Sequence, residues 1–217
     1  LYYGTLKAGL AQPLVTTAIL PPRMHLAESG GISFTRGGNA VLLGLAAPSP
    51  DSIPADSLVG KAKYDLWNYQ DPELQPAQKL SLARDRDRTY QALFNLNSRK
   101  LVQLTTDSMP TVTLSDDGRI GLASTSVAYN IQKMWGDEGN DVYLVDPANG
   151  GRKLIRQKIS GQAQLSVDGK YVAYFDQGHW YSYNIATGKT VNLTAPIQGV
   201  RFDQETWSTP DTPAAWG

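Results

Sequence analysis

The groups of this sequence that could act in hydrolysis are its serines, its two histidines and its acidic side chains. A serine-hydrolase elbow needs Gly-x-Ser-x-Gly, which places the serine on a strained strand-to-helix turn. The sequence has no such motif. Its nearest match, Ser29 followed by Gly30 and Gly31, lacks the leading glycine and precedes a predicted strand. We therefore predict no nucleophile of this type.

The two histidines are His25, in a loop after two prolines, and His179, in a predicted hairpin turn over residues 176–180. Either imidazole could act as a base, because its ordinary pKa lies near neutrality. They do not have the close spacing of a pair of metal ligands. We interpret both as turn or surface histidines, and we predict no catalytic, cofactor-binding or metal-ligating residue in this chain.

Other ligand patterns are also incomplete. Residues 136–141 are acidic and Gly-rich, but they lack the alternating oxygen ligands and distal glutamate of a Ca²⁺ loop, so we predict a long inter-strand loop. The phosphate-binding pattern Gly-x-x-x-x-Gly-Lys-Ser/Thr is absent. Asn192 begins an Asn-x-Thr glycosylation triplet at a predicted strand end, a match that is common by chance. The sequence therefore predicts no cofactor.

The composition excludes further classes of protein. The 217 residues carry 20 Lys+Arg and 20 Asp+Glu, so no basic field favours nucleic acid or an anionic membrane. The sequence has no cysteine, which rules out disulfides and thiolate sites. The longest apolar run, residues 40–47, is far shorter than the ~20 residues of a membrane span. The chain begins at Leu1 without a leader pattern, and we expect both ends to be internal to a longer protein.

The elements that must carry these residues are predicted to be strands. Residues 112–123 and 163–174 each show a strand, a Ser-x-Asp-Gly-basic turn and a second strand, and residues 32–43 form a degenerate third copy. Asp and Gly favour such turns because Asp bonds its own backbone and Gly accepts positive φ. A second hairpin follows each copy, over residues 90–105, 141–155 and 180–194.

Four short strands in roughly 40–50 residues are typical of a propeller blade. We therefore predict an all-β fold of four-stranded antiparallel blades in an incomplete or open β-propeller, because four blades are the lower limit for closure. The predicted units are a partial blade 1–26, an enlarged blade 27–106, blades 108–158 and 159–197, and the start of a further blade 198–217. Most strand aromatics are expected to pack between blades: Tyr143, Tyr171, Tyr174, Trp180, Tyr181 and Tyr183.

The enlarged blade contains an insertion. We predict a Pro/Ser loop over residues 48–56, an alternating strand over 63–69 and a turn over 70–76 before residues 77–82. Residues 84–88 alternate Arg and Asp. Their opposite charges cancel, so we interpret them as a solvated turn rather than a nucleic-acid patch.

Two segments carry a resemblance to a known family: residues 30–34 with 41–44, and residues 64–78, which read Tyr-Asp-Leu-Trp-Asn-Tyr-Gln-Asp-Pro-Glu-Leu-Gln-Pro-Ala-Gln. From about residue 30 to residue 217 the chain resembles the propeller portion of prolyl-oligopeptidase-family serine peptidases, the relatives of dipeptidyl peptidase IV and acylaminoacyl peptidase, and looks most like a bacterial branch of large exported members. The Ser-x-Asp-Gly hairpins are generic and are shared with Tol-B-like propellers.

The resemblance implies that the catalytic groups belong to an α/β-hydrolase domain C-terminal to the propeller, whose motifs this sequence lacks. The propeller would cap the active site, filter substrates by size and contribute peptide-binding side chains. The implied partners are a peptide substrate and the hydrolase domain of the same parent chain, and the implied location is periplasmic or extracellular. The adjacent Glu pair of dipeptidyl peptidases is missing, and Asp137-Glu138 is a poor substitute, so dipeptide release is unsupported.

Three functions stay open from the sequence. The first is a non-catalytic propeller segment of a serine peptidase, and the second is a stand-alone Tol-B-like propeller that binds a protein or glycan. The third is a propeller glycosidase, which needs two carboxylates facing one pocket. We predict that this chain alone hydrolyses no peptide.

Overall fold

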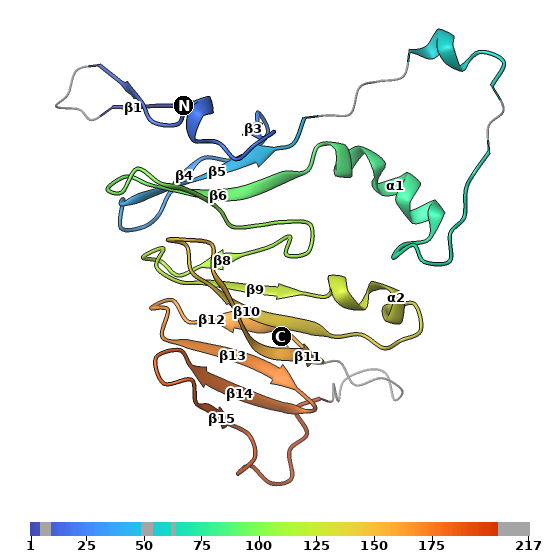
Figure 1. Cartoon of the computed structure of the whole chain (residues 1–217). Coiled ribbons are helices and arrows are strands. Elements are labelled where there is room, and N and C mark those ends of the chain that lie inside the picture. The colour runs from blue at the N-terminus through green and yellow to red at the C-terminus, as the bar shows by residue number, and fades with distance from the viewer. Residues whose placement is uncertain (5–9, 49–53, 62–63, 204–217) are drawn as a thin grey trace.

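The computed structural model describes residues 1–4, 10–48, 54–61 and 64–203, which form a stack of antiparallel sheets (Figure 1). The N-terminal pair is β1 (Tyr2–Tyr3) and β2 (Gln12–Pro13). Sheet 1 contains β3 (His25–Leu26), β4 (Ser33–Phe34), β5 (Ala40–Ala46), β6 (Thr89–Asn95) and β7 (Leu101–Gln103). Both β3 and β4 pair with β5.

Two further sheets follow, each with its four strands in sequence order. Sheet 2 contains β8 (Thr113–Leu114), β9 (Gly121–Thr125), β10 (Asn140–Val145) and β11 (Arg152–Ile159). Sheet 3 contains β12 (Ala163–Leu165), β13 (Tyr171–Asp176), β14 (His179–Asn184) and β15 (Thr190–Asn192). The prediction of four-stranded antiparallel sheets is confirmed in sheets 2 and 3, whereas sheet 1 has five strands because β3 and β4 both pair with β5; none of these sheets closes on itself. Residues 198–217 were expected to begin a further blade. Of this segment, residues 204–217 lie outside the described residues.

The insertion of sheet 1 differs from the prediction. Residues 64–69 form no strand, and α1 (Gln75–Arg86) is a helix that includes Ala77–Leu82 and most of the predicted turn at 84–88. Alternation predicted a strand over 63–69. Both edges of β5 are occupied, by β6 and by β3 and β4, and both edges of β6 are occupied, by β5 and β7, so neither strand can pair with it. The helix forms because Pro76 lies in its first turn and good helix formers such as Ala, Gln, Lys, Leu and Arg follow.

The remaining helical segments are short. They are η1 (Thr17–Ile19), η2 (Ala55–Leu58), η3 (Val127–Tyr129) and α2 (Asn130–Lys133). Within the described ranges, no helix combines the length and apolar character needed to cross a bilayer.

Apolar side chains fill the spaces between successive sheets. One cluster, which includes Val15 and Phe94, joins the N-terminal segment to sheet 1. A second lies between sheets 1 and 2 and includes Leu104 and Val145. A third lies between sheets 2 and 3 and contains the predicted aromatics Tyr174, Tyr181 and Tyr183, while Tyr143 packs at the edge of the second. The packing prediction is confirmed for these four residues. Tyr171 does not pack between sheets, because it lies on the opposite face of sheet 3 and is 45% exposed.

The Ser-x-Asp-Gly turns form as predicted, and their polar side chains close each hairpin. The Ser166 hydroxyl donates to Asp168 (2.8 Å), and Asp168 also pairs with Lys170 (2.9 Å). Ser115 and Asp117 repeat the first contact at 2.7 Å. The hydrogen bonds from Lys170 and Ser166 lower the pKa of Asp168 to about 2.

This depressed pKa predicts an acid-labile contribution to stability. An unfolded aspartate titrates near 3.9, so the stabilisation by Asp168 is present above about pH 4 and is lost as the pH falls through 2. We expect Asp168→Asn to lower the melting temperature at neutral pH and the difference from wild type to shrink steadily as the pH falls from 4 to 2. Thermal unfolding followed by circular dichroism between pH 2 and 7 measures this. A difference that stays constant over that range would contradict it.

In an antiparallel sheet, successive connections lie at opposite ends of the strands, and so on opposite sides of the stack. The β5–β6 connection (residues 47–88) and the β9–β10 connection (126–139) therefore leave the same edge, which carries α1 and α2 in Figure 1. The equivalent β13–β14 connection is only the two-residue turn Gln177-Gly178. We call this side the insertion edge, because the two long connections meet there.

Candidate functional site

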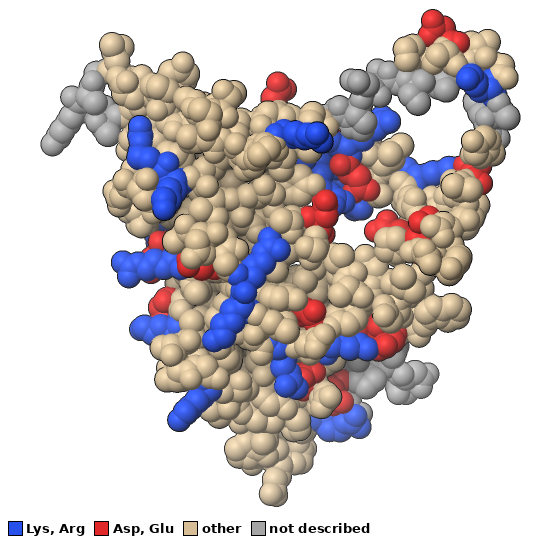
Figure 2. Space-filling view, in the orientation of Figure 1, with Lys and Arg blue, Asp and Glu red and all other residues tan. Residues whose placement is uncertain are grey.

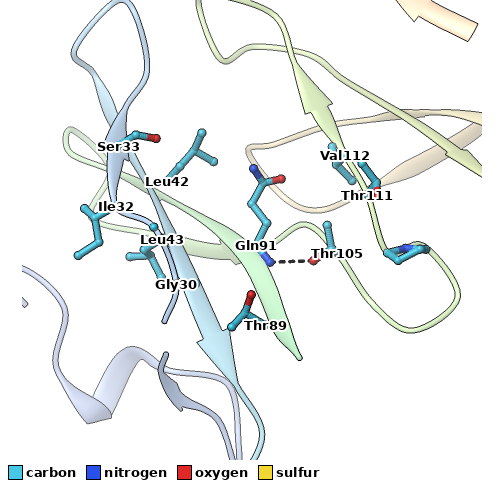
Figure 3. A pocket seen from close by; sticks show the side chains of 13 residues that line it. Gly30, Ile32, Ser33, Leu42, Leu43, Thr89, Gln91, Thr105, Thr111 and Val112 are labelled. Carbon is cyan, nitrogen blue, oxygen red and sulfur yellow. Dashed lines mark hydrogen bonds between the residues drawn. The ribbon is translucent and has the colours of Figure 1, made fainter. Parts of the chain in front are cut away.

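A cavity of about 440 Å³ lies between sheet 1 and the segment that leads into β8 (Figure 3). Its walls come from the inner edge of sheet 1, from β5 and β6, and from residues 105–112. The side chains that line it include Ile32, Ser33, Leu42, Gln91, Thr111 and Val112. We call this space the inner cavity.

Gln91 is the polar residue that projects into the inner cavity. Its backbone N–H donates to the Thr105 hydroxyl (2.7 Å), which ties β6 to the following loop. Figure 3 shows its side chain reaching into the space between Leu42 and Val112. No hydrogen bond within the described residues occupies its side-chain amide. The amide is therefore available to a ligand.

A close approach of two glycines shapes the inner edge of this cavity. A Cβ on Gly30 would lie 2.7 Å from the Gly44 Cα, so only hydrogen atoms fit between the two backbones. The Ala27 N–H donates to the Gly44 carbonyl (2.9 Å) beside this contact. Residues 30–33 consequently lie close against β5, where Ser33 pairs with Leu42.

A larger chamber of about 610 Å³ adjoins the inner cavity and shares Thr89, Thr105 and Pro110 with it. It lies on the insertion edge between the end of α1, the 105–110 loop and the start of the β9–β10 connection. Its other lining residues are Glu73, Arg84, Asp87, Arg88, Tyr90, Thr106, Asp107, Val127 and Asn130. We call it the outer chamber, and its lining is charged with both signs.

Arg88 organises the wall of the outer chamber. Its guanidinium contacts Asp85 (2.6 Å) and Asp107 (2.9 Å), and the Tyr90 hydroxyl donates to Asp107 (2.7 Å). The hydrogen bond to Asp107 raises the pKa of Tyr90, and the bond to Asp85 raises the pKa of Arg88. The phenol therefore stays protonated and the guanidinium stays charged near neutral pH. This network fixes the end of α1 against the loop before β8.

A third groove of about 420 Å³ continues from the outer chamber, with which it shares Glu73 and Asn130. It lies between the start of α1 and α2, and Leu74, Ala77 and Met134 are its apolar lining. The inner cavity, the outer chamber and this end groove adjoin one another through shared lining residues, and together we call them the insertion cleft. Figure 2 shows acidic and basic side chains interspersed over this face of the molecule, so no extended field of one sign surrounds it.

The candidate residues from the sequence lie elsewhere. His25 is in β3, paired with Ala46, and not in the predicted loop. His179 is the first residue of β14 rather than part of the turn, and its Nδ1 lies 3.0 Å from the Thr194 hydroxyl. Ser29 and both histidines are absent from the lining of the cleft. In the described segments no cluster of three His, Asp or Glu side chains could hold a metal ion.

The two other sequence candidates have structural contacts. Asp137 of the acidic segment forms an ion pair with Lys158 (2.8 Å). The Asn192 side-chain oxygen accepts hydrogen bonds from the backbone N–H groups of Thr194 (3.0 Å) and Ala195 (2.8 Å), which closes the turn after β15. Sequence reasoning missed Gln91, Thr105 and Asp107, because their types are ordinary for strands and loops.

The lining of the cleft offers a ligand both neutral and charged hydrogen-bonding groups. Gln91, Ser33 and Thr111 offer neutral donors and acceptors, and no histidine lies beside these hydroxyls in the described part of the chain. Carboxylates of Glu73, Asp87 and Asp107 line the outer chamber, as a glycosidase would require. However, Asp107 Oδ1 already accepts hydrogen bonds from both Arg88 and Tyr90.

No family model and no curated protein matches the chain. Solved structures that resemble it include TolB from Acinetobacter baumannii (17% identity over 88% of this chain and 37% of that one, TM-score 0.35). The β-propeller domain of the Trilobed protease from Pyrococcus furiosus shares 12% identity over 75% of this chain and 41% of its own (TM-score 0.36). A prolyl endopeptidase structure shares 11% over 88% of this chain and 25% of its own (TM-score 0.41). The chain thus has a distant likeness to propellers and spans less than half of the length of these three.

Proposed function

We propose that this chain is a non-catalytic propeller segment that binds peptide in the insertion cleft, as part of a prolyl-oligopeptidase-family serine peptidase. The observation that carries the peptide-binding part is the set of three adjoining pockets along the insertion edge, with neutral hydrogen-bonding groups in the inner cavity. The peptidase part rests on the resemblance of residues 30–44 and 64–78 to that family.

The lining of the inner cavity matches the needs of an extended peptide. Each peptide unit carries one N–H donor and one C=O acceptor, and both lose water on binding. The Gln91 amide and the hydroxyls of Ser33 and Thr111 can donate as well as accept, so they can replace that water. Leu42 and Val112 offer apolar contact for a side chain. Three adjoining pockets in succession suit an extended chain better than a compact ligand.

The binding proposal predicts a measurable role for Gln91. The test uses pools of fluorescein-labelled decapeptides, each pool random except for one fixed central residue. Each pool is titrated with the purified 217-residue chain, and binding is measured by fluorescence polarisation. We expect saturable binding of at least one pool. Gln91→Ala is expected to weaken that binding about 5- to 10-fold, the effect of losing one or two hydrogen bonds.

Gln164→Ala is the matched control, because Gln164 is an exposed glutamine on β12 that does not line the cleft. We expect it to bind like wild type. Absence of binding by every pool, or equal weakening in both variants, would contradict the proposal.

The peptidase part has a separate test in the parent coding sequence. The proposal requires a downstream Gly-x-Ser-x-Gly motif followed by Asp and His, and a stop codon directly after Gly217 would contradict it. It also requires that the purified chain cleave none of a panel of peptide nitroanilides. Export to the periplasm or the medium belongs to the same proposal, and cell fractionation tests it.

A stand-alone Tol-B-like module that binds a protein or glycan is the alternative. The exposed aromatics of the insertion favour it: Tyr64 is 84% exposed, Trp67 62% and Tyr69 91%. Neighbouring apolar side chains in solvent mark interaction surfaces. Ala substitution of these three residues should leave decapeptide binding unchanged if the cleft is the site, and should abolish ligand binding if the aromatics are.

A further inference from the structure

The β9–β10 connection forms one wall of the insertion cleft, yet it has little packing of its own. Residues 127–138 contain no buried side chain, and α2 is only four residues long. A helix of that length is not stable without outside support. Contacts to the rest of the sheet must therefore determine where this connection lies.

Asp141, at the start of β10, provides these contacts. It is only 6% exposed, and its Oδ1 accepts hydrogen bonds from the Tyr129 hydroxyl (2.6 Å) and from the Lys158 backbone N–H (2.9 Å). The Tyr143 hydroxyl donates more weakly to Oδ2 (3.5 Å). A buried carboxylate held by several neutral donors is a directional anchor, because moving away would leave it unsatisfied.

Lys158 holds the other end of the same connection. Its Nζ pairs with Asp137 (2.8 Å) and lies 5.6 Å from the centre of the Tyr129 ring. Its backbone has φ of 50°, a left-handed conformation that is costly for lysine and that lies at a bulge in the β10–β11 pairing. Gly139 packs so tightly against Lys158 that a Cβ would collide with it. The connection is thus clamped at Tyr129 and at Asp137.

We propose that Asp141 is a positioning residue, which acts through Tyr129 to hold the β9–β10 connection as the wall of the insertion cleft. Tyr129 lies between Val127 and Asn130, which line the outer chamber, and α2 continues to Lys133 and Met134 in the end groove. The Arg88–Asp107 network does the same for α1 across the chamber. The effect of Asp141 on ligand affinity rests on the proposed peptide-binding function.

The experiment compares Tyr129→Phe with Tyr143→Phe by hydrogen–deuterium exchange, without peptide. Both variants remove one hydroxyl near Asp141, but only Tyr129 belongs to the connection. We expect amides of residues 127–137 to exchange about tenfold faster in Tyr129→Phe, with β9 and β10 unchanged, and no change in Tyr143→Phe. Decapeptide affinity, measured as above, should fall about 3- to 10-fold in Tyr129→Phe only.

The two readouts separate the two proposals. Unchanged exchange of residues 127–137 in Tyr129→Phe, or faster exchange throughout sheet 2, would overturn the positioning role. Faster local exchange with wild-type peptide affinity would overturn its influence on binding. If the wild-type chain binds no peptide at all, the proposed function fails, and the exchange data still decide whether Asp141 positions the connection.

Discussion

Gly169→Ala is expected to destabilise the chain by about 2–4 kcal/mol. Gly169 has φ of +67°, where an alanine is strained. A Cβ there would also lie 2.8 Å from the Ile120 Cγ2 and 3.1 Å from the Ser115 Cβ. Those two residues belong to the hairpin of sheet 2, so the added methyl group would push sheets 2 and 3 apart.

Gly38→Ala is the matched control for this prediction. Gly38 occupies the same turn position in sheet 1 with φ of +65°, but a Cβ added there would have no atom within 4 Å. It should cost only the backbone strain, about 1 kcal/mol. Urea unfolding of the two variants measures the difference. Equal losses would show that the close packing of successive hairpins adds nothing.

Tyr174→Ala is expected to cost about 3–5 kcal/mol, the usual loss for a large buried aromatic. Tyr174 is 3% exposed in the cluster between sheets 2 and 3, and its ring stacks on Tyr181 with centroids 5.2 Å apart. Its removal leaves a cavity between the sheets that the paired strands cannot close. Urea unfolding should show a lower midpoint with an unchanged slope.

Tyr171→Ala is the control, since Tyr171 is on the same strand but on the opposite face and is 45% exposed. We expect a loss below about 1 kcal/mol. A comparable loss in both variants would mean that the two faces of sheet 3 are equally covered in solution.

The hairpin repeat could be predicted because its causes are local. Ser166, Asp168 and Gly169 contact one another within four residues, and their turn geometry follows from side-chain hydrogen bonding and positive φ. The insertion could not be predicted from alternation alone. Residues 64–69 have a strand pattern, but a strand needs a free edge to pair with. The strands that flank this insertion have none, since β5 lies between β6 and the pair β3 and β4, and β6 lies between β5 and β7.

The candidate site could not be found from the sequence. Arg88 and Asp107 were visible only as ordinary charges, and Gln91 only as one polar residue within a strand. Their roles come from contacts between residues 14 to 19 positions apart, such as Gln91 with Thr105 and Arg88 with Asp107. His25 and His179, which the sequence analysis considered as bases and interpreted as turn or surface residues, lie in strands outside the cleft.

The sequence by itself determined the repeat of short strands, the turns and four of the aromatic residues that pack between sheets, because strand period and turn geometry depend on near neighbours. Only the tertiary structure decided that two long connections, from different sheets, meet at one edge. Antiparallel order places the β5–β6 and β9–β10 connections on the same side, and the packing of sheet 1 on sheet 2 then brings them together. The cleft exists between these units and belongs to no single segment, so no local pattern encodes it.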